Sequence, residues 1–133
     1  MVPLDKEIIL VDQEAGVESF GRGIEILCDT VLIPVEPSDE SMELAGKIKY
    51  MAGGLGICRV RAVLNKVEEE EQEEYLQEAL SQMDVRFLGT LSNQKEVRLR
   101  NMRGQGFSSE FCYETAGTLA RMMLDEAQMK YKK

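Results

Sequence analysis

The residues best placed for ligand chemistry lie in segment 8–23, IILVDQEAGVESFGRG. An apolar run, residues 8–11, leads directly into Asp12, followed by a second carboxylate at Glu14 and by Gly16. A glycine allows a backbone N–H to approach a ligand closely, and open parallel sheets bind ligands just beyond the carboxyl ends of their strands. If residues 8–11 form a strand, Asp12 stands where a cation or phosphate would bind. The alternative is a strand that simply ends in an Asp-containing turn.

Composition excludes several other kinds of chemistry. The 133-residue chain has no histidine, so it contains neither a Ser-His-Asp unit nor a metal site with imidazole ligands. Its net charge of -8 argues against non-specific binding to nucleic acid or anionic membranes. Three cysteines without a C-x-x-C pair suggest neither a disulfide framework nor a zinc finger. We expect one domain, residues 1–133, in a reducing cytoplasm, without a membrane-spanning segment.

The elements that must position these residues alternate between short apolar runs and helical patterns. This alternation predicts an α/β fold, with a doubly wound, mainly parallel sheet of about four strands and flanking helices. Two buried strands are predicted at residues 8–11 and 30–35, with Pro34 awkward in the second. The predicted strands 60–65 and 85–89 each carry an arginine, which favours positions nearer a sheet edge.

Three helices are predicted between and after these strands. Ser38 is a candidate N-cap for a helix that ends at Gly53 and Gly54. Residues 68–74 contain six Glu and open a second helix, which indicates either a solvated helical face or a cation site, the first being the ordinary explanation. A terminal helix from Ser108 onward should pack across the sheet through apolar residues at helical spacing, namely Phe111, Thr115, Leu119, Met122 or Met123, and Ala127.

Motifs from nearly the whole chain point to one family. Residues 12–23 read D-Q-E-A-G-V-E-S-F-G-R-G, residues 29–38 read D-T-V-L-I-P-V-E-P-S, residues 40–45 read E-S-M-E-L-A, and residues 65–67 read N-K-V. As a set, they resemble the CooC-type accessory ATPases that mature nickel carbon monoxide dehydrogenase. These belong to the P-loop group that contains MinD, ParA and the nitrogenase iron protein. The resemblance implies a P-loop NTPase-like fold.

The resemblance also implies a nucleotide site for ATP or ADP. Asp12 would hold Mg2+ through water, and Gly16 would sense the γ-phosphate. Asn65 would hydrogen-bond the adenine, with Lys66 beside it in the N-K-V triplet. Residues 91–98, which include Asn93, resemble the family's loop over the base, although the usual proline is absent.

Two parts of the family pattern are missing from this sequence. There is no G-x-G-G-x-G-K-[ST] loop, whose backbone amides and lysines hold the phosphates. The C-x-C pair that binds nickel in CooC-type proteins is also absent. In the family the P-loop strand lies between the strands equivalent to residues 8–12 and 30–35. These two segments should therefore either pair with each other or accept a strand from another chain.

Three functional hypotheses follow. The first is the C-terminal half of a CooC-like ATPase, which would bind nucleotide weakly and would not hydrolyse ATP alone. The alternative is a non-catalytic interaction or dimerisation module derived from a MinD/ParA-type ATPase. A response-regulator-like domain is disfavoured, because its acidic pair and strand-end lysine do not occur in the right order. Partners would be the missing P-loop half, a second copy or a metalloenzyme target. The basic residues Lys95, Arg98, Arg100 and Arg103 form either a solvated face or a docking surface for an acidic partner.

Overall fold

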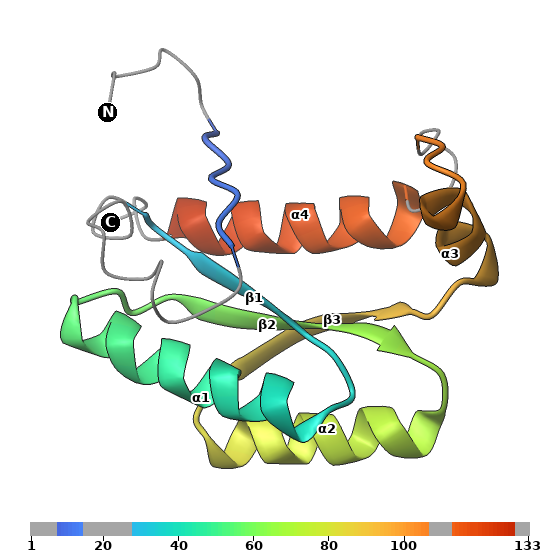
Figure 1. Ribbon diagram of the computed structural model, residues 1–133. Coiled ribbons are helices and arrows are strands. Elements are labelled where there is room, and N and C mark those ends of the chain that lie inside the picture. Colours follow the sequence, from blue (N-terminus) through green and yellow to red (C-terminus); the bar gives the residue numbers. More distant parts are fainter. Residues whose placement is uncertain (1–7, 15–27, 107–112, 130–133) are drawn as a thin grey trace.

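The structure has a parallel sheet between two helical layers (Figure 1). The computed structural model describes residues 8–14, 28–106 and 113–129. The strands are β1 (Val31–Val35), β2 (Val60–Val67) and β3 (Arg86–Ser92), all parallel and in the order β1-β2-β3. The helices are α1 (Asp39–Gly54), α2 (Glu70–Gln82), α3 (Lys95–Met102) and α4 (Tyr113–Met129). This arrangement confirms the predicted α/β class and is consistent with part of a P-loop NTPase-like fold.

The central strand, β2, departs from the sequence prediction. Arg61 suggested a place near a sheet edge for this strand, but β2 pairs with β1 on one side and with β3 on the other. The arginine is accommodated because its Nε donates to Glu126 Oε2 of α4 at 2.7 Å. Pro34 lies in β1, which pairs only with β2 among the described strands, so its missing N–H need not disrupt a second ladder.

The predicted strand at residues 8–11 is wrong. These residues are irregular, and their four apolar side chains are between 39% and 88% exposed. The predicted pairing with residues 30–35 is also not found, because the described sheet contains only β1, β2 and β3. A strand needs a neighbour for its backbone groups, and apolar side chains alone do not supply one.

Helices α1 and α2, both predicted from sequence, cover one face of the sheet. Ser38 caps α1, with its Oγ accepting from the Ser41 N–H at 3.2 Å. Helix α1 ends at Gly54, and Gly56 follows with a positive φ of 78°. The residues buried between these helices and the sheet form the main core, which includes Val35, Ala45, Val60, Leu64, Leu76 and Leu80.

Helix α4 covers the opposite face and approaches β3 closely. Its Leu119 packs with Val63 and Leu88. A Cβ atom placed on Gly89 would lie 2.3 Å from Leu119 Cδ2, so any larger residue at this position would force the Leu119 side chain to shift. The predicted terminal helix is confirmed over Tyr113–Met129, whereas the predicted residues 108–112, with Phe111, lie outside the described residues.

Helix α3 was not predicted. The predicted loop at residues 91–98 is instead the end of β3 followed by the first residues of α3. None of the helices in the described ranges is long and apolar enough to cross a membrane.

Candidate functional site

Polar side chains gather at the carboxyl edge of the sheet. Glu36 follows β1, Asn65 and Lys66 end β2, and Asn93 follows β3. The strands are parallel and adjacent, so these residues come to one edge although they are up to 57 positions apart in sequence, from Glu36 to Asn93. This is the edge at which open α/β sheets bind ligands. Figure 1 shows it at the side of the molecule where α3 lies.

Lys66 has an unusual backbone conformation. Its φ is 58°, in the left-handed region that non-glycine residues rarely adopt, and the pairing register of β2 with β3 shifts between Asn65 and Val67. The Lys66 Nζ lies 2.5 Å from Glu36 Oε1, which joins the ends of β2 and β1. Both side chains are about half exposed, so this ion pair adds little to stability.

Asn93 is held by two hydrogen bonds. Its backbone N–H donates to the Val67 carbonyl at 2.9 Å, and its Nδ2 donates to Glu68 Oε1 at 2.6 Å. The side-chain amide is therefore oriented, and its Oδ1 remains available to accept a hydrogen bond from a ligand.

Asn65 is the residue of this group whose side chain is available to bind a ligand. It is partly buried, and its side chain has no hydrogen-bond partner among the described residues. Successive side chains of a strand point to opposite faces, so Asn65 shares the α4 face with Arg61 and Val63. An amide in this position can both donate to and accept from a planar ligand.

The catalytic residues predicted from sequence are not brought to this edge. Asp12 is exposed in an irregular segment, and Figure 1 shows residues 8–14 (blue) apart from the carboxyl ends of β2 and β3. Gly16 lies outside the described residues. The structure thus brings together Asn65, Lys66 and Asn93 but not Asp12.

Sequence reasoning missed the two carboxylates that hold the site together. Glu36 and Glu68 both follow strand ends directly, which is the signal that could have identified them. Their partners, Lys66 and Asn93, are 30 and 25 positions away. These pairings depend on strand order and register, which a single sequence does not give.

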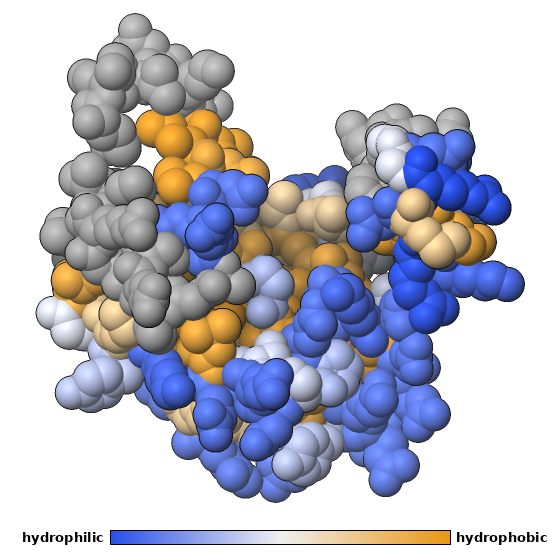
Figure 2. Space-filling view, viewed as in Figure 1, coloured by the Kyte–Doolittle hydropathy of each residue, from blue (hydrophilic) through white to orange (hydrophobic). Residues whose placement is uncertain are grey.

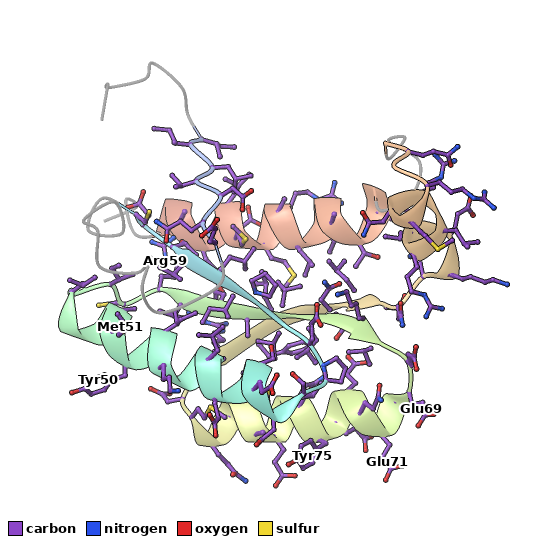
Figure 3. All side chains as sticks on the ribbon, viewed as in Figure 1. Tyr50, Met51, Arg59, Glu69, Glu71 and Tyr75 are labelled. Carbon is purple, nitrogen blue, oxygen red and sulfur yellow. The ribbon has the colours of Figure 1, made fainter. Side chains whose placement is uncertain are left out.

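The acidic start of α2 is partly explained by contacts within the chain. Glu73 Oε1 accepts from Thr90 Oγ1 at 2.8 Å and from Gln77 Nε2 at 3.1 Å. Figure 3 shows Glu71 and Tyr75 on the side of α2 that faces away from the sheet. Acidic residues in a first helical turn also suit the positive end of the helix dipole. In the part of the chain that the structure describes, no three His, Cys, Asp or Glu side chains could hold a metal ion together.

Comparison with known proteins finds relatives that are described as ATP-binding proteins. The chain is 33% identical over 106 residues to MJ0084, an uncharacterized ATP-binding protein of Methanocaldococcus jannaschii, and this match covers 80% of the chain and 41% of the relative. A second uncharacterized ATP-binding protein of that organism, MJ0823, is 33% identical over 91 residues, which is 68% of the chain and 35% of the relative.

A third relative has a named role. The carbon monoxide dehydrogenase accessory protein CooC of Rhodospirillum rubrum is 29% identical over 122 residues, or 90% of the chain and 46% of CooC. No family model and no solved structure matches the chain. The chain spans less than half the length of these three relatives. The matches nevertheless cover most of its own residues, and the chain is a relative of the CooC-like ATPases.

Proposed function

We propose that these 133 residues form the base-binding part of a CooC-like nucleotide-binding accessory protein that takes ATP or ADP. The observation that carries this proposal is the convergence of Asn65 and Asn93 at the carboxyl edge of the sheet. Two of the relatives are described as ATP-binding proteins, and the third as an accessory protein of carbon monoxide dehydrogenase. The free thiol of Cys58 suits a reducing cytoplasm as the compartment.

The chemistry of the two amides fits an adenine base. The Watson-Crick edge of adenine presents one acceptor, N1, beside one donor, the N6 amino group. The Asn65 amide can satisfy both, and Asn93 Oδ1 can accept from a further amino or hydroxyl group because Glu68 already holds its Nδ2. Lys66 follows Asn65 at the end of β2, and its charge is balanced by Glu36.

The proposal includes no ATP hydrolysis by this segment alone. Phosphate transfer depends on a loop of backbone amides and lysine around the phosphates, and no such loop occurs in these 133 residues. We propose that Asp12 holds Mg2+ through a water molecule and that Gly16 senses the γ-phosphate. One carboxylate is not a magnesium site, so further ligands would have to come from elsewhere. No residue of this chain is assigned to nickel.

A second candidate, a protein-interaction module, is supported by the outer edge of β1. The Val31 N–H points toward β2, because it donates to the carbonyl of Arg59, the residue just before β2. Alternate residues of a parallel strand bond to the same neighbour, so Leu32 presents its N–H and C=O to the outside, where no described strand lies. Pro34 presents only a carbonyl there. A strand from another polypeptide, such as the P-loop half, could pair with these groups.

Titration of the 15N-labelled chain with ADP, followed by NMR, tests the first candidate. We expect weak binding, with Kd about 1 mM, and chemical-shift changes centred on the side-chain amides of Asn65 and Asn93. Asn65→Ala should abolish these changes, whereas Asn101→Ala, on the exposed surface of α3, should leave them intact. Shifts that are absent, or that survive Asn65→Ala, would refute the site.

The same sample distinguishes the two candidates. Measurable ATP hydrolysis would contradict the proposal that the segment is inactive alone. Amide exchange at Leu32 tests the interaction module, since this N–H should exchange rapidly in a monomer and slowly once a strand has been added. Light scattering gives the mass under both conditions.

A further inference from the structure

Helix α3 carries the densest group of positive charges in the described residues. Lys95, Arg98 and Arg100 lie on the helix, and Arg103 is its C-cap residue. We call these four residues the basic cluster. Glu96 is the single carboxylate among residues 95–103, whereas the whole chain has a net charge of -8. The basic cluster is therefore a local reversal of the charge of the protein.

Packing against the described part of the chain does not account for α3. The helix has only eight residues and none of them is buried. Its N-cap, Gln94, makes no side-chain capping bond, and Lys95 places a cation at the positive end of the helix dipole. Isolated helices of this length are marginal in water, so a contact on the outer side of α3 would stabilise it.

Most of the basic cluster has no counterion among the described residues. Arg100 lies 3.8 Å from Glu96 and donates to the Gly106 carbonyl at 3.3 Å. Lys95, Arg98 and Arg103 form no ion pair with any residue that the structure describes. Elsewhere in the described residues, Arg61 is paired at 2.7 Å with Glu126 and Lys66 with Glu36.

The basic cluster also borders an apolar contact point. An open hollow on the surface is lined by Lys95, Glu96, Leu99, Arg100, Arg103 and Gln105. Leu99 is only partly buried, and the neighbouring Met102 is 77% exposed. Figure 2 shows this end of the molecule as strongly hydrophilic, with apolar atoms among the blue ones. The hollow thus combines one aliphatic side chain, Leu99, with the cationic side chains of Lys95, Arg100 and Arg103.

We propose that α3 is the docking site for an acidic segment of a partner protein, in which an apolar residue is flanked by Asp or Glu. The carboxylates would pair with Lys95, Arg98 and Arg103, and the apolar residue would contact Leu99. Such complementarity accelerates association and selects the partner. A nucleic acid fits less well. Its phosphates would extend beyond the basic stretch of residues 95–103 and would then face a protein of net negative charge. This inference does not depend on nucleotide binding.

The test is fluorescence polarisation of a labelled peptide in which one Leu is flanked on each side by two Asp and two Glu. The triple variant Lys95→Glu, Arg98→Glu, Arg103→Glu should weaken binding at least about tenfold, because it reverses all three counterions. The matched control Lys47→Glu, Lys49→Glu, Arg121→Glu changes the net charge equally on other surfaces and should weaken binding by less than about threefold. Circular dichroism verifies that both variants are folded.

Two further probes separate the apolar contact and the class of ligand. Leu99→Ser, or a peptide with Ser in place of Leu, should weaken binding about threefold to tenfold without changing the charge. Equal losses in the two triple variants would overturn the proposal, and so would failure of the peptide to bind. A single-stranded oligonucleotide that binds as tightly as the peptide would also overturn it, in favour of a general polyanion site.

Discussion

The two faces of the sheet are covered very differently. On one face, α1 and α2 bury 13 residues in a continuous core. On the other face, α4 alone buries a cluster of three, Val63, Leu88 and Leu119. Ion pairs also hold α4 to the second face, because Glu126 of α4 lies 2.7 Å from Arg61 Nε and 3.6 Å from Arg86 Nη1.

This difference shows where the described fold is complete and where it remains open. Leu32 of β1 is 39% exposed, and it alternates with Ile33 and Val35, which are buried toward α1. Leu32 and Pro34 therefore lie on the α4 side of the sheet, beyond the small cluster. The face covered by α1 and α2 needs nothing further, whereas the β1 end of the other face has apolar surface available for a partner.

The comparison predicts that the same truncation has unequal costs on the two faces. Leu80 of α2 is fully buried, so Leu80→Ala should lower the free energy of unfolding by about 4 kcal/mol. Leu119 of α4 lies in the three-residue cluster, where neighbouring side chains can relax, and Leu119→Ala should cost about 2 kcal/mol. Urea denaturation followed by circular dichroism measures both values. Equal costs would show that the two faces are equally well packed.

The ion pair under α4 should have an intermediate effect. Glu126→Gln removes the partner of a largely buried guanidinium and should cost about 2 kcal/mol. Glu43→Gln is the matched control, because Glu43 pairs with Lys47 at 3.9 Å on the exposed surface of α1, and it should change stability by less than about 0.5 kcal/mol. If the two variants unfold at the same urea concentration, charge does not hold α4 to the sheet.

The close approach of α4 to β3 predicts a non-additive pair. Gly89→Ala forces a methyl group against Leu119, which should cost about 1.5 kcal/mol. In the Leu119→Ala background the same change should cost less than about 0.5 kcal/mol, since the obstructing side chain is gone. A double-mutant cycle in urea measures the difference, and additive costs would contradict the contact.

The smallest effects are expected on the open side. Leu32→Ser and Leu10→Ser replace side chains that are already exposed, so each should change stability by less than about 0.5 kcal/mol. A larger loss in the purified chain would mean that these residues are covered in solution. Analytical ultracentrifugation of the same variants would then detect any accompanying loss of oligomers.

The sequence was sufficient where structure is determined locally. The Ser38 cap, the apolar face of α2 and the strand predicted at residues 30–35 follow from nearby residues, and all three elements are confirmed, although the strand is buried only at alternate residues, Ile33 and Val35. Residues 8–11 have an equally strong strand pattern but pair with none of the described strands, so the pattern predicts the wrong state. The central position of β2 also escaped prediction, because it depends on Glu126, 65 positions away from Arg61.

The candidate site shows the same division. Parallel strands bring their ends to one edge, so the predicted residues Asn65, Lys66 and Asn93 lie at that edge. The carboxylates that hold Lys66 and Asn93 were not predicted, since their pairing requires the strand order. The roles of these residues toward a nucleotide remain predictions.

The contact between Gly89 and Leu119 has a consequence for the kinetics of α4. An α-helix turns about 100° per residue, so a slip by one residue would move Leu119 away from the only glycine of β3. At any other residue of β3, the Leu119 side chain would meet a Cβ atom. Helix α4 therefore detaches as a unit rather than sliding by degrees, and its backbone amides should become accessible to hydrogen exchange in a single cooperative opening.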